Sequence, residues 1–288
     1  MNLAALKAEY VAVLDDLYTT EEIRNFFNWI CEQYLGLKPF EVSTSSNLEV
    51  TPEKLALFEK ALAELQLEKP IQQILGKGYF YGMEFKVNAH TLIPRPETEE
   101  LVAMILEDYK SHPGPVRILD IGTGTGCIPI SLAKHLKQAE LYAIDISSAA
   151  LEVAKQNAID NQVVVKFGEI DILKASLLSS LFTKVDQFDV IVSNPPYVRE
   201  SEKKAMKNNV LKYEPDSALY VSDHNPLLFY EQISNLAAGH LKENGRLYFE
   251  INQYLGAKTK AVVYEAGFKD VEVFKDVFEN DRMIRAEL

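Results

Sequence analysis

The sequence predicts an α/β protein in which a mostly parallel sheet, covered by helices on both faces, follows a small all-helical N-terminal domain. From Val116 onward, short apolar runs alternate with helical segments, which is typical of a parallel sheet. Before residue 70 the apolar residues recur with helical spacing only. Near the end of the chain, two strand-like runs flank Glu279-Asn280-Asp281, so the sheet is predicted to finish in an antiparallel pair.

Composition and charge narrow the class of protein. The 288 residues are 47% hydrophobic, and no run reaches the ~18 apolar residues of a membrane span. The N-terminus lacks the apolar core of a signal peptide, so we expect a cytoplasmic protein without membrane contact. Cys31 and Cys127 have no paired spacing and the five histidines are scattered, so neither a disulfide framework nor a metal site is predicted. The net charge of −12 disfavours binding along a nucleic-acid backbone.

The N-terminal domain is expected at residues 1–75 and contains three helical patterns. The first runs from Leu3 to Leu17, and the second opens at Thr20 and closes near Gly36. The third begins at Thr51 as N-cap with a proline at the first helical position. These patterns predict a small helical bundle.

A linker is expected at residues 76–95, followed by the second domain at residues 96–288. Residues 79–87 have strand composition around a central glycine, which predicts a β-hairpin. The connector at residues 92–99 is stiffened by prolines. Two interpretations of it stay open, an ordinary ordered linker and a segment that lies over the active site.

The second domain is expected to contain five strands and four helices before the antiparallel tail. The expected strands lie at about 116–121, 140–145, 163–168, 188–193 and 246–251, and the helices at about 126–137, 148–160, 226–241 and 255–266. Two tail strands, at 271–274 and 283–286, bring the sheet to seven. The charged stretch from Glu200 to Asn209 is expected to be a solvated loop.

The most informative stretch follows the strand at 188–193. There the chain reads Asn194-Pro195-Pro196-Tyr197, and the two prolines force it to leave the sheet at the edge where α/β folds bind ligands. The Asn194 side-chain oxygen and the Pro195 carbonyl are acceptors, and Tyr197 supplies a flat face. Two acceptors suit one planar NH2 group, of a carboxamide or of an exocyclic base amine. The alternative is a proline-rich strand exit without a binding role.

A second set of residues ends three neighbouring strands. Gly122-Thr123-Gly124-Thr125-Gly126 has the spacing G-x-G-x-G, which departs from the dinucleotide-binding pattern. Asp145 can accept hydrogen bonds from both ribose hydroxyls, and Asp171-Ile172 can offer an acceptor to an adenine amine and an apolar wall to its ring. Each feature alone is more often a tight turn, a cap or a solvated strand end. Their occurrence at successive strand ends favours a nucleoside-binding site.

Taken together, these residues resemble the class I S-adenosylmethionine-dependent methyltransferases, which have a Rossmann-like sheet. A fuller match is to the release factor glutamine methyltransferase family, and it rests on Thr91–Glu99, Leu119–Gly126, Val192–Val198 and Tyr213-Glu214-Pro215. The resemblance extends over essentially the whole chain. It implies methylation of the side-chain amide nitrogen of the glutamine in the Gly-Gly-Gln motif of peptide chain release factors, which are therefore the expected partners.

The resemblance also implies roles for particular residues. The cofactor S-adenosyl-L-methionine would contact Gly122, Thr123, Gly124, Thr125, Gly126, Asp145, Asp171, Ile172 and Asn194. The substrate glutamine would be bound by Asn194, Pro195, Pro196 and Tyr197, with Asn194, Pro195 and Tyr197 as the catalytic residues. Some members have tryptophan where this chain has Ile172, so the adenine contact is expected without aromatic stacking.

Three alternatives to this function stay open at the level of sequence. A ribosomal-protein glutamine methyltransferase would use the same chemistry on another protein. A DNA adenine-amine methyltransferase would grip a flipped base with the same tetrapeptide, but the acidic balance and the lack of a large basic insertion disfavour it, so no direct nucleic-acid substrate is expected. A non-catalytic cofactor-binding or assembly protein would leave the intact substrate motif unexplained.

Overall fold

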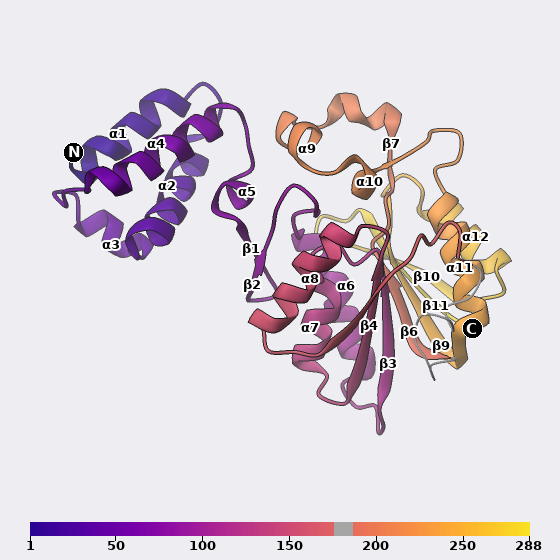
Figure 1. Ribbon diagram of the computed structural model, residues 1–288. Coiled ribbons are helices and arrows are strands. Elements are labelled where there is room, and N and C mark those ends of the chain that lie inside the picture. The colour runs from indigo at the N-terminus through magenta and orange to yellow at the C-terminus, as the bar shows by residue number, and fades with distance from the viewer. Residues whose placement is uncertain (176–186) are drawn as a thin grey trace. The chain divides into compact units, whose positions relative to one another are not determined.

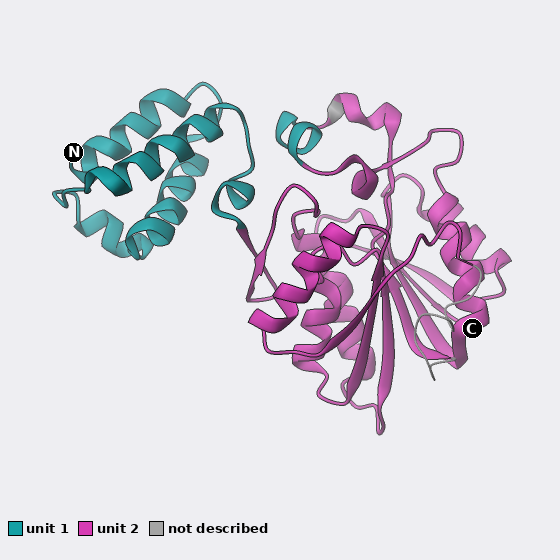
Figure 2. Ribbon diagram, in the orientation of Figure 1, with its two compact units in different colours: residues 1–76, 207–213 teal, residues 77–206, 214–288 magenta. Residues whose placement is uncertain are grey.

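The computed structural model describes residues 1–175 and 187–288. The chain divides into two compact units, one of residues 1–76 with 207–213 and one of residues 77–206 with 214–288 (Figure 2). Within the described ranges, no helix combines the length and the apolar character needed to cross a membrane.

The first unit is built from helices. They are α1 (Leu3–Leu14), α2 (Thr20–Leu35), α3 (Pro39–Thr44), α4 (Pro52–Gln66) and α5 (Ile71–Leu75), joined by α9 (Asn208–Tyr213) from later in the chain. The three long helices that the sequence predicts are confirmed, although α1 ends at Leu14 rather than Leu17. The short helices α3 and α5 were not predicted, because one or two turns are too few to show a helical period.

Local sequence rules account for the ends of these helices. Thr19 caps α2, since its side chain accepts from the Glu22 amide while the Glu22 carboxylate accepts from the Thr19 amide. Gly36 ends α2 with a φ of 71°, and Thr51 caps α4 as predicted.

Three aromatic side chains form the centre of the first unit. Tyr10 packs edge-on against Phe27 and Phe58, with ring centroids 5.2 and 6.3 Å away. All three rings are buried, and the Tyr10 hydroxyl donates to the Phe58 carbonyl oxygen at 2.6 Å. This hydrogen bond supplies the partner that a buried hydroxyl needs.

Helix α9 belongs to the first unit through hydrogen bonds at both of its ends. The Tyr213 hydroxyl donates to the Leu67 carbonyl oxygen, and the Gln73 amide donates to the Tyr213 carbonyl oxygen, each at 2.8 Å. At the other end, the Asn208 amide donates to the Glu68 carboxylate at 2.8 Å.

The described side chains of residues 200–209 are exposed or half-buried, as a solvated segment requires, but the prediction of a loop is wrong. Residues Glu200–Ala205 form a 3-10 helix, η1, and α9 begins at Asn208. The Glu202 carboxylate accepts from the Arg199 amide and from the Arg199 guanidinium, so the charged side chains are used to cap η1.

The second unit begins with the predicted hairpin. Strands β1 (Lys77–Phe80) and β2 (Met83–Lys86) pair antiparallel, and the turn residues Tyr81 and Gly82 both have positive φ.

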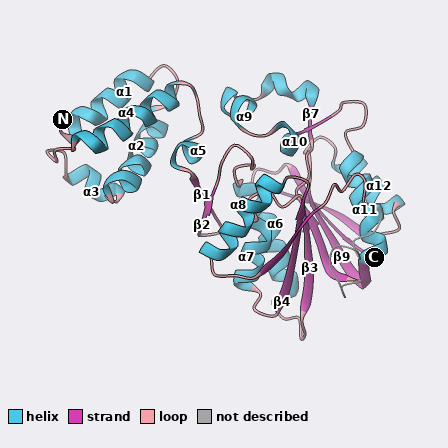
Figure 3. Cartoon of the chain, viewed as in Figure 1, coloured by secondary structure: helices cyan, strands magenta, loops and turns pink. Residues whose placement is uncertain are grey.

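A seven-stranded sheet forms the centre of the second unit, with the order β10-β11-β9-β6-β3-β4-β5 among the described residues (Figures 1 and 3). The strands are β3 (Val116–Ile121), β4 (Ala139–Asp145), β5 (Val165–Glu169), β6 (Phe188–Ser193), β9 (Leu241–Glu250), β10 (Lys269–Lys275) and β11 (Asp281–Glu287). Strand β11 runs antiparallel to β9 and β10, while the other pairs are parallel. The predicted fold class, including the antiparallel end, is therefore confirmed.

Helices cover both faces of this sheet, with α6 (Pro96–Tyr109), α7 (Cys127–His135) and α8 (Ser148–Asp160) on one face and α11 (Leu228–His240) and α12 (Gly256–Glu265) on the other (Figure 1). Successive residues of β3 show the alternation. Ile118 belongs to the apolar cluster that includes Ile105 of α6, whereas Leu119 belongs to the cluster with Ile233 of α11.

Strand β9 starts five residues before the predicted strand at 246–251. Leu241 already pairs with Phe188, after which the register shifts before Val190 pairs with Arg246. The residues between include Asn244 with a φ of 63°. An Asn-Gly dipeptide usually indicates a turn, but Asn244-Gly245 forms an irregularity inside β9.

Three short elements beyond β6 were not predicted. Strands β7 (Val198–Arg199) and β8 (Tyr220–Val221) form a separate parallel pair, and α10 (Asp216–Leu219) precedes β8. Two residues are too few for a strand pattern to be visible in the sequence.

Candidate active site

The loop Asn194-Pro195-Pro196-Tyr197 leaves the sheet at the C-terminal end of β6, as its prolines predict. The last strand residue, Ser193, is buried and its hydroxyl donates to the Ile121 carbonyl oxygen of β3 at 2.6 Å. The end of β6 is therefore tied to the end of β3, where the glycine loop begins.

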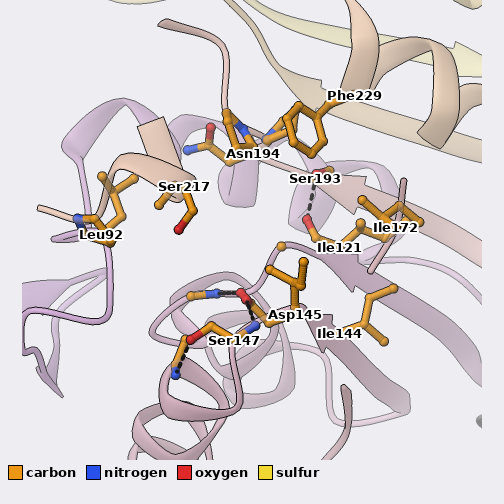
Figure 4. A pocket seen from close by; sticks show the side chains of 18 of the residues that line it. Leu92, Ile121, Ile144, Asp145, Ser147, Ile172, Ser193, Asn194, Ser217 and Phe229 are labelled. Carbon is orange, nitrogen blue, oxygen red and sulfur yellow. Dashed lines mark hydrogen bonds between the residues drawn. The ribbon is translucent and has the colours of Figure 1, made fainter. Parts of the chain in front are cut away.

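A cavity of about 290 Å³ lies at this edge of the sheet (Figure 4). Its walls come from the ends of β3, β4, β5 and β6, from residues 90–92 before α6, and from α10 and α11. The size and position are those of a small-molecule site in an open α/β sheet.

The sequence-predicted residues that line the cavity are Gly122, Gly124, Asp145, Asp171, Ile172, Asn194, Pro195 and Pro196. Thr123, Thr125 and Gly126 are buried, and Tyr197 is half-buried; none of these four is part of the cavity lining. The structure thus brings together residues that end four different strands.

The glycine loop turns back on itself because Gly122, Gly124 and Gly126 have φ values of 76°, 54° and 78°. A Cβ atom on Gly122 or Gly124 would meet no atom within 4 Å, so the backbone there is open to a ligand. At Gly126 a side chain is disfavoured for a different reason, since a Cβ atom would lie 3.0 Å from Ile130 and 3.2 Å from Ala154 of α8. Its glycine allows close packing of helices.

Asp145 holds the glycine loop against the end of β4. Its carboxylate accepts from the Gly124 amide at 2.8 Å and from the Ser147 amide at 2.9 Å (Figure 4). A carboxylate has about four acceptor positions, so two hydrogen bonds leave room for ribose hydroxyls.

Asp171 is already engaged within its own turn. Its carboxylate accepts from the Leu173 amide at 3.0 Å and lies 2.7 Å from the Lys174 ammonium, which lowers the pKa of the Asp171 carboxyl. Ile172 lines the same side of the cavity.

Phe229 of α11 also lines the cavity, and sequence reasoning missed it. Phe229 thus gives the cavity an aromatic ring, which Ile172 does not provide. Phe229 lies outside every motif, and the helical period of α11 alone does not mark it.

A buried carboxylate, also missed, connects the two ends of the Asn194–Tyr197 loop. Glu250 ends β9 and accepts from the Thr98 hydroxyl at 2.6 Å and from the Tyr197 hydroxyl at 2.9 Å. Thr98 in turn accepts from the Asn194 side-chain amide at 3.2 Å. Burial raises the pKa values of both the Glu250 carboxyl and the Tyr197 hydroxyl. The rule that strand ends carry site residues could have found Glu250.

The connector before α6 contributes directly to the cavity through His90, Thr91 and Leu92. It is held in place by the buried Glu214, whose carboxylate accepts from the Ile93 amide at 3.0 Å and from the Arg95 guanidinium at 2.5 Å. Glu214 directly precedes Pro215, which also lines the cavity.

Asp120 lies in β3, two residues before Gly122 of the glycine loop, and is almost fully buried. Burial raises the pKa of its carboxyl to about 7. Among the described residues, no group of three His, Cys, Asp or Glu side chains is arranged to hold a metal ion.

Comparison with known proteins gives consistent matches. A family model described as a methyltransferase domain matches residues 114–275. The release factor glutamine methyltransferase of Flavobacterium psychrophilum is 47% identical over 287 residues, which cover 99% of each chain. The protein of the same name from Bacteroides thetaiotaomicron is 40% identical over 273 residues, 95% of each chain.

Solved structures show the same fold. A methyltransferase from Pyrococcus furiosus matches with a TM-score of 0.51 at 17% identity, covering 82% of this chain and 98% of its own. At this identity the likeness concerns the fold alone.

Proposed function

This chain belongs to the release factor glutamine methyltransferase family, and from that premise we propose which of its residues bind the glutamine and which bind the cofactor. The chain is an S-adenosyl-L-methionine-dependent protein-glutamine N-methyltransferase. The observation that supports the residue assignment is the single cavity lined by Asn194 and Pro195 on one side and by Gly122, Gly124 and Asp145 on another.

Asn194 and Pro195 are proposed to hold the substrate amide. The Asn194 side-chain oxygen and the Pro195 carbonyl would each accept one N–H of the glutamine NH2 group and so aim its nitrogen. An amide nitrogen is a poor nucleophile, because its lone pair is delocalised into the carbonyl. Positive charge develops on this nitrogen as it reacts, and the two acceptors stabilise that charge more than they stabilise the ground state.

Pro196 and Tyr197 complete the proposed substrate site. Pro196 lines the cavity. Because the prolines already hold the loop rigid, the loop would lose little conformational entropy when the substrate binds. The Tyr197 hydroxyl is bound to Glu250, so the proposed contribution of Tyr197 is the face of its ring and the anchoring of the loop.

The residues present fit S-adenosyl-L-methionine. The open backbone at Gly122 and Gly124 would admit it closely, Asp145 would accept from its ribose hydroxyls, and Asp171 with Ile172 would border its adenine. Thr123, Thr125 and Gly126, which do not line the cavity, would shape this loop. When bound, the cofactor supplies a methyl group on a positively charged sulfur. The apolar walls of the cavity, which include Ile144 and Phe229, would keep water away from the transfer.

The domain roles follow from the family and remain a proposal. Residues 1–75 would recognise the release factor, and residues 96–288 would catalyse the methyl transfer. Residues 76–95 would link these two domains. A peptide chain release factor as partner also implies a cytoplasmic location. The net charge of −12 argues against a DNA substrate for the same loop.

The test is methyl transfer from labelled S-adenosyl-L-methionine to a purified release factor. A release factor whose Gly-Gly-Gln glutamine is replaced, a mixture of ribosomal proteins and a DNA duplex serve as controls. We expect label on the intact factor only. Label on a ribosomal protein alone or on DNA alone would replace the proposed substrate, and label on none would refute the proposal.

A further inference from the structure

The proposed mechanism gives no catalytic or binding role to Glu250, a buried carboxylate. Glu250 has 1% of its surface exposed, and it lies at the end of β9, the strand beside β6 in the sheet. Both of its carboxylate oxygens are hydrogen-bonded, Oε2 to the Thr98 hydroxyl and Oε1 to the Tyr197 hydroxyl. An ionised carboxylate can only accept hydrogen bonds, so the Thr98 and Tyr197 hydroxyls each donate their one hydrogen to Glu250.

This constraint decides the polarity of the next hydrogen bond. With its proton directed at Glu250, the Thr98 oxygen can only accept from Asn194. The NH2 end of the Asn194 amide therefore faces Thr98, with Nδ2 and Oγ1 3.2 Å apart. The opposite end of the amide, Oδ1, is left as the acceptor that Asn194 offers to a ligand, and no described residue donates to it.

The alternative orientation of the Asn194 amide is unfavourable for the same reason. A flipped amide would set Oδ1 against the lone pairs of the Thr98 oxygen, and two acceptors do not form a hydrogen bond. It would also present NH2 to the cavity, where it would meet the NH2 group of a glutamine substrate. The chain Glu250–Thr98–Asn194 also polarises Oδ1, since each hydrogen bond strengthens the next.

We propose that Thr98 and Glu250 are positioning residues that fix the amide orientation of Asn194 and so make the site select an NH2 donor. Glu250 reaches both ends of the loop, through Thr98 to Asn194 and directly to Tyr197. Asn252 secures the same loop, because its amide donates to the Tyr197 carbonyl oxygen at 3.0 Å. The inference rests on the proposed function of Asn194.

The decisive variant is Thr98→Val, which keeps the shape of the side chain and removes the hydroxyl. Thr98→Ser is the conservative variant, because it keeps the hydroxyl. Thr259→Val is the matched control: Thr259 is also a buried helical threonine whose hydroxyl is hydrogen-bonded, to the Leu255 carbonyl oxygen in α12, and it does not line the cavity. All three are assayed as full chains on a release factor, together with the wild type.

For Thr98→Val we expect kcat to fall about tenfold or more, the order that partners behind a site's ligands contribute. The KM for the release factor and the Kd for S-adenosyl-L-methionine should stay within about threefold, since neither binding surface is removed. Thr98→Ser should keep kcat within about threefold of the wild type, and Thr259→Val should leave it unchanged. A kcat of Thr98→Val equal to that of Thr259→Val, or equal losses for the Val and Ser variants, would overturn the inference.

Glu250→Gln provides a second test, and as a single variant it can be assayed even if Thr98→Val does not fold. The glutamine places one NH2 donor against one of the two hydroxyls, so that hydroxyl can no longer donate in the same direction. We expect kcat to fall about tenfold or more, and in a folded double variant with Thr98→Val no further fall, because both changes act through Asn194. Independent, multiplying losses, or an unchanged kcat, would refute the shared role. A wild type that fails to label the release factor would instead refute the proposed function.

Discussion

At the scale of the residue, Asp145 carries two tasks at once. It fixes the glycine loop through the Gly124 amide, and it is the carboxylate proposed to accept from the cofactor's ribose. Both tasks concern the proposed cofactor side of the cavity, whereas Asn194 and Pro195 are proposed to bind the substrate. Variants of the two sides should therefore change different measured quantities.

We predict that Asp145→Ala weakens the binding of S-adenosyl-L-methionine at least about tenfold, because hydrogen bonds to a charged acceptor are lost. Calorimetric titration of the purified variant measures this affinity. Glu169→Ala is the matched control, since Glu169 is an exposed carboxylate at the end of the neighbouring strand and does not line the cavity. Equal affinity of Asp145→Ala and the wild type would remove the ribose assignment.

Asp120 is predicted to make the stability of the protein depend on pH. Its carboxyl pKa of about 7 in the folded protein lies above the usual 3.8, so the folded state holds this proton more tightly than the unfolded chain does. Between those two values the free energy of unfolding falls as pH rises, by up to about 1.4 kcal/mol per pH unit. Below the usual value the carboxyl is protonated in both states and adds no slope.

Asp120→Asn tests this, because the amide does not ionise. We expect the thermal midpoint of the variant, relative to that of the wild type, to rise between pH 5 and pH 7. Midpoints of both proteins are measured at the two pH values in the same salt. A difference between the two proteins that is constant with pH would show that Asp120 ionises normally.

At the scale of the element, the site depends on strands that all end at one edge. Strands β3, β4, β5 and β6 are parallel neighbours, so their C-terminal residues meet there. Gly126, the residue before α7, lies close to α8, since a Cβ atom on it would be 3.2 Å from Ala154.

Gly126→Ala should therefore destabilise the second unit by roughly 1–3 kcal/mol, through the clash with Ile130 and Ala154 and the positive φ. A matched change is Gly239→Ala in α11, where an added Cβ meets nothing within 4 Å. That variant should be neutral or more stable, by about 0.5–1 kcal/mol. Thermal unfolding compares the two. Equal midpoints for both variants would contradict the packing argument.

At the scale of the whole molecule, the chain returns to the first unit after it has built the substrate loop. Helix α9 lies between η1 and Glu214 in the sequence, yet its hydrogen bonds join it to Leu67, Glu68 and Gln73. The stretch between the Asn194–Tyr197 loop and Pro215 therefore contains residues 207–213, which belong to the first unit.

We predict that Tyr213→Phe loosens α9 without affecting the sheet, because it removes one hydrogen bond to the Leu67 carbonyl oxygen. Hydrogen exchange of residues 207–213 should become roughly 2–10 times faster, while exchange in β3 stays unchanged. Tyr264→Phe, on an exposed tyrosine of α12, is the control. Unchanged exchange at residues 207–213 would show that the hydroxyl does not hold α9.

The sequence by itself determined the features that are local in the chain. Helix α8 and strands β3 and β6 have the predicted bounds, and the hairpin, the Thr51 cap and the antiparallel tail are where their patterns indicate. The reason is that apolar period, glycine and proline act on the residues beside them. The motifs at successive strand ends, together with Thr91–Glu99 and Tyr213-Glu214-Pro215, also sufficed to identify the family.

Only the tertiary structure decided which distant side chains meet. Thr98 and Glu250 are 152 residues apart in the sequence, Ile93 and Glu214 are 121 apart, and Phe229 enters the cavity from a helix without a motif. Such contacts depend on how the elements pack, and a strand or helix pattern carries no information about its partner. The orientation of Asn194 is a property of that packing.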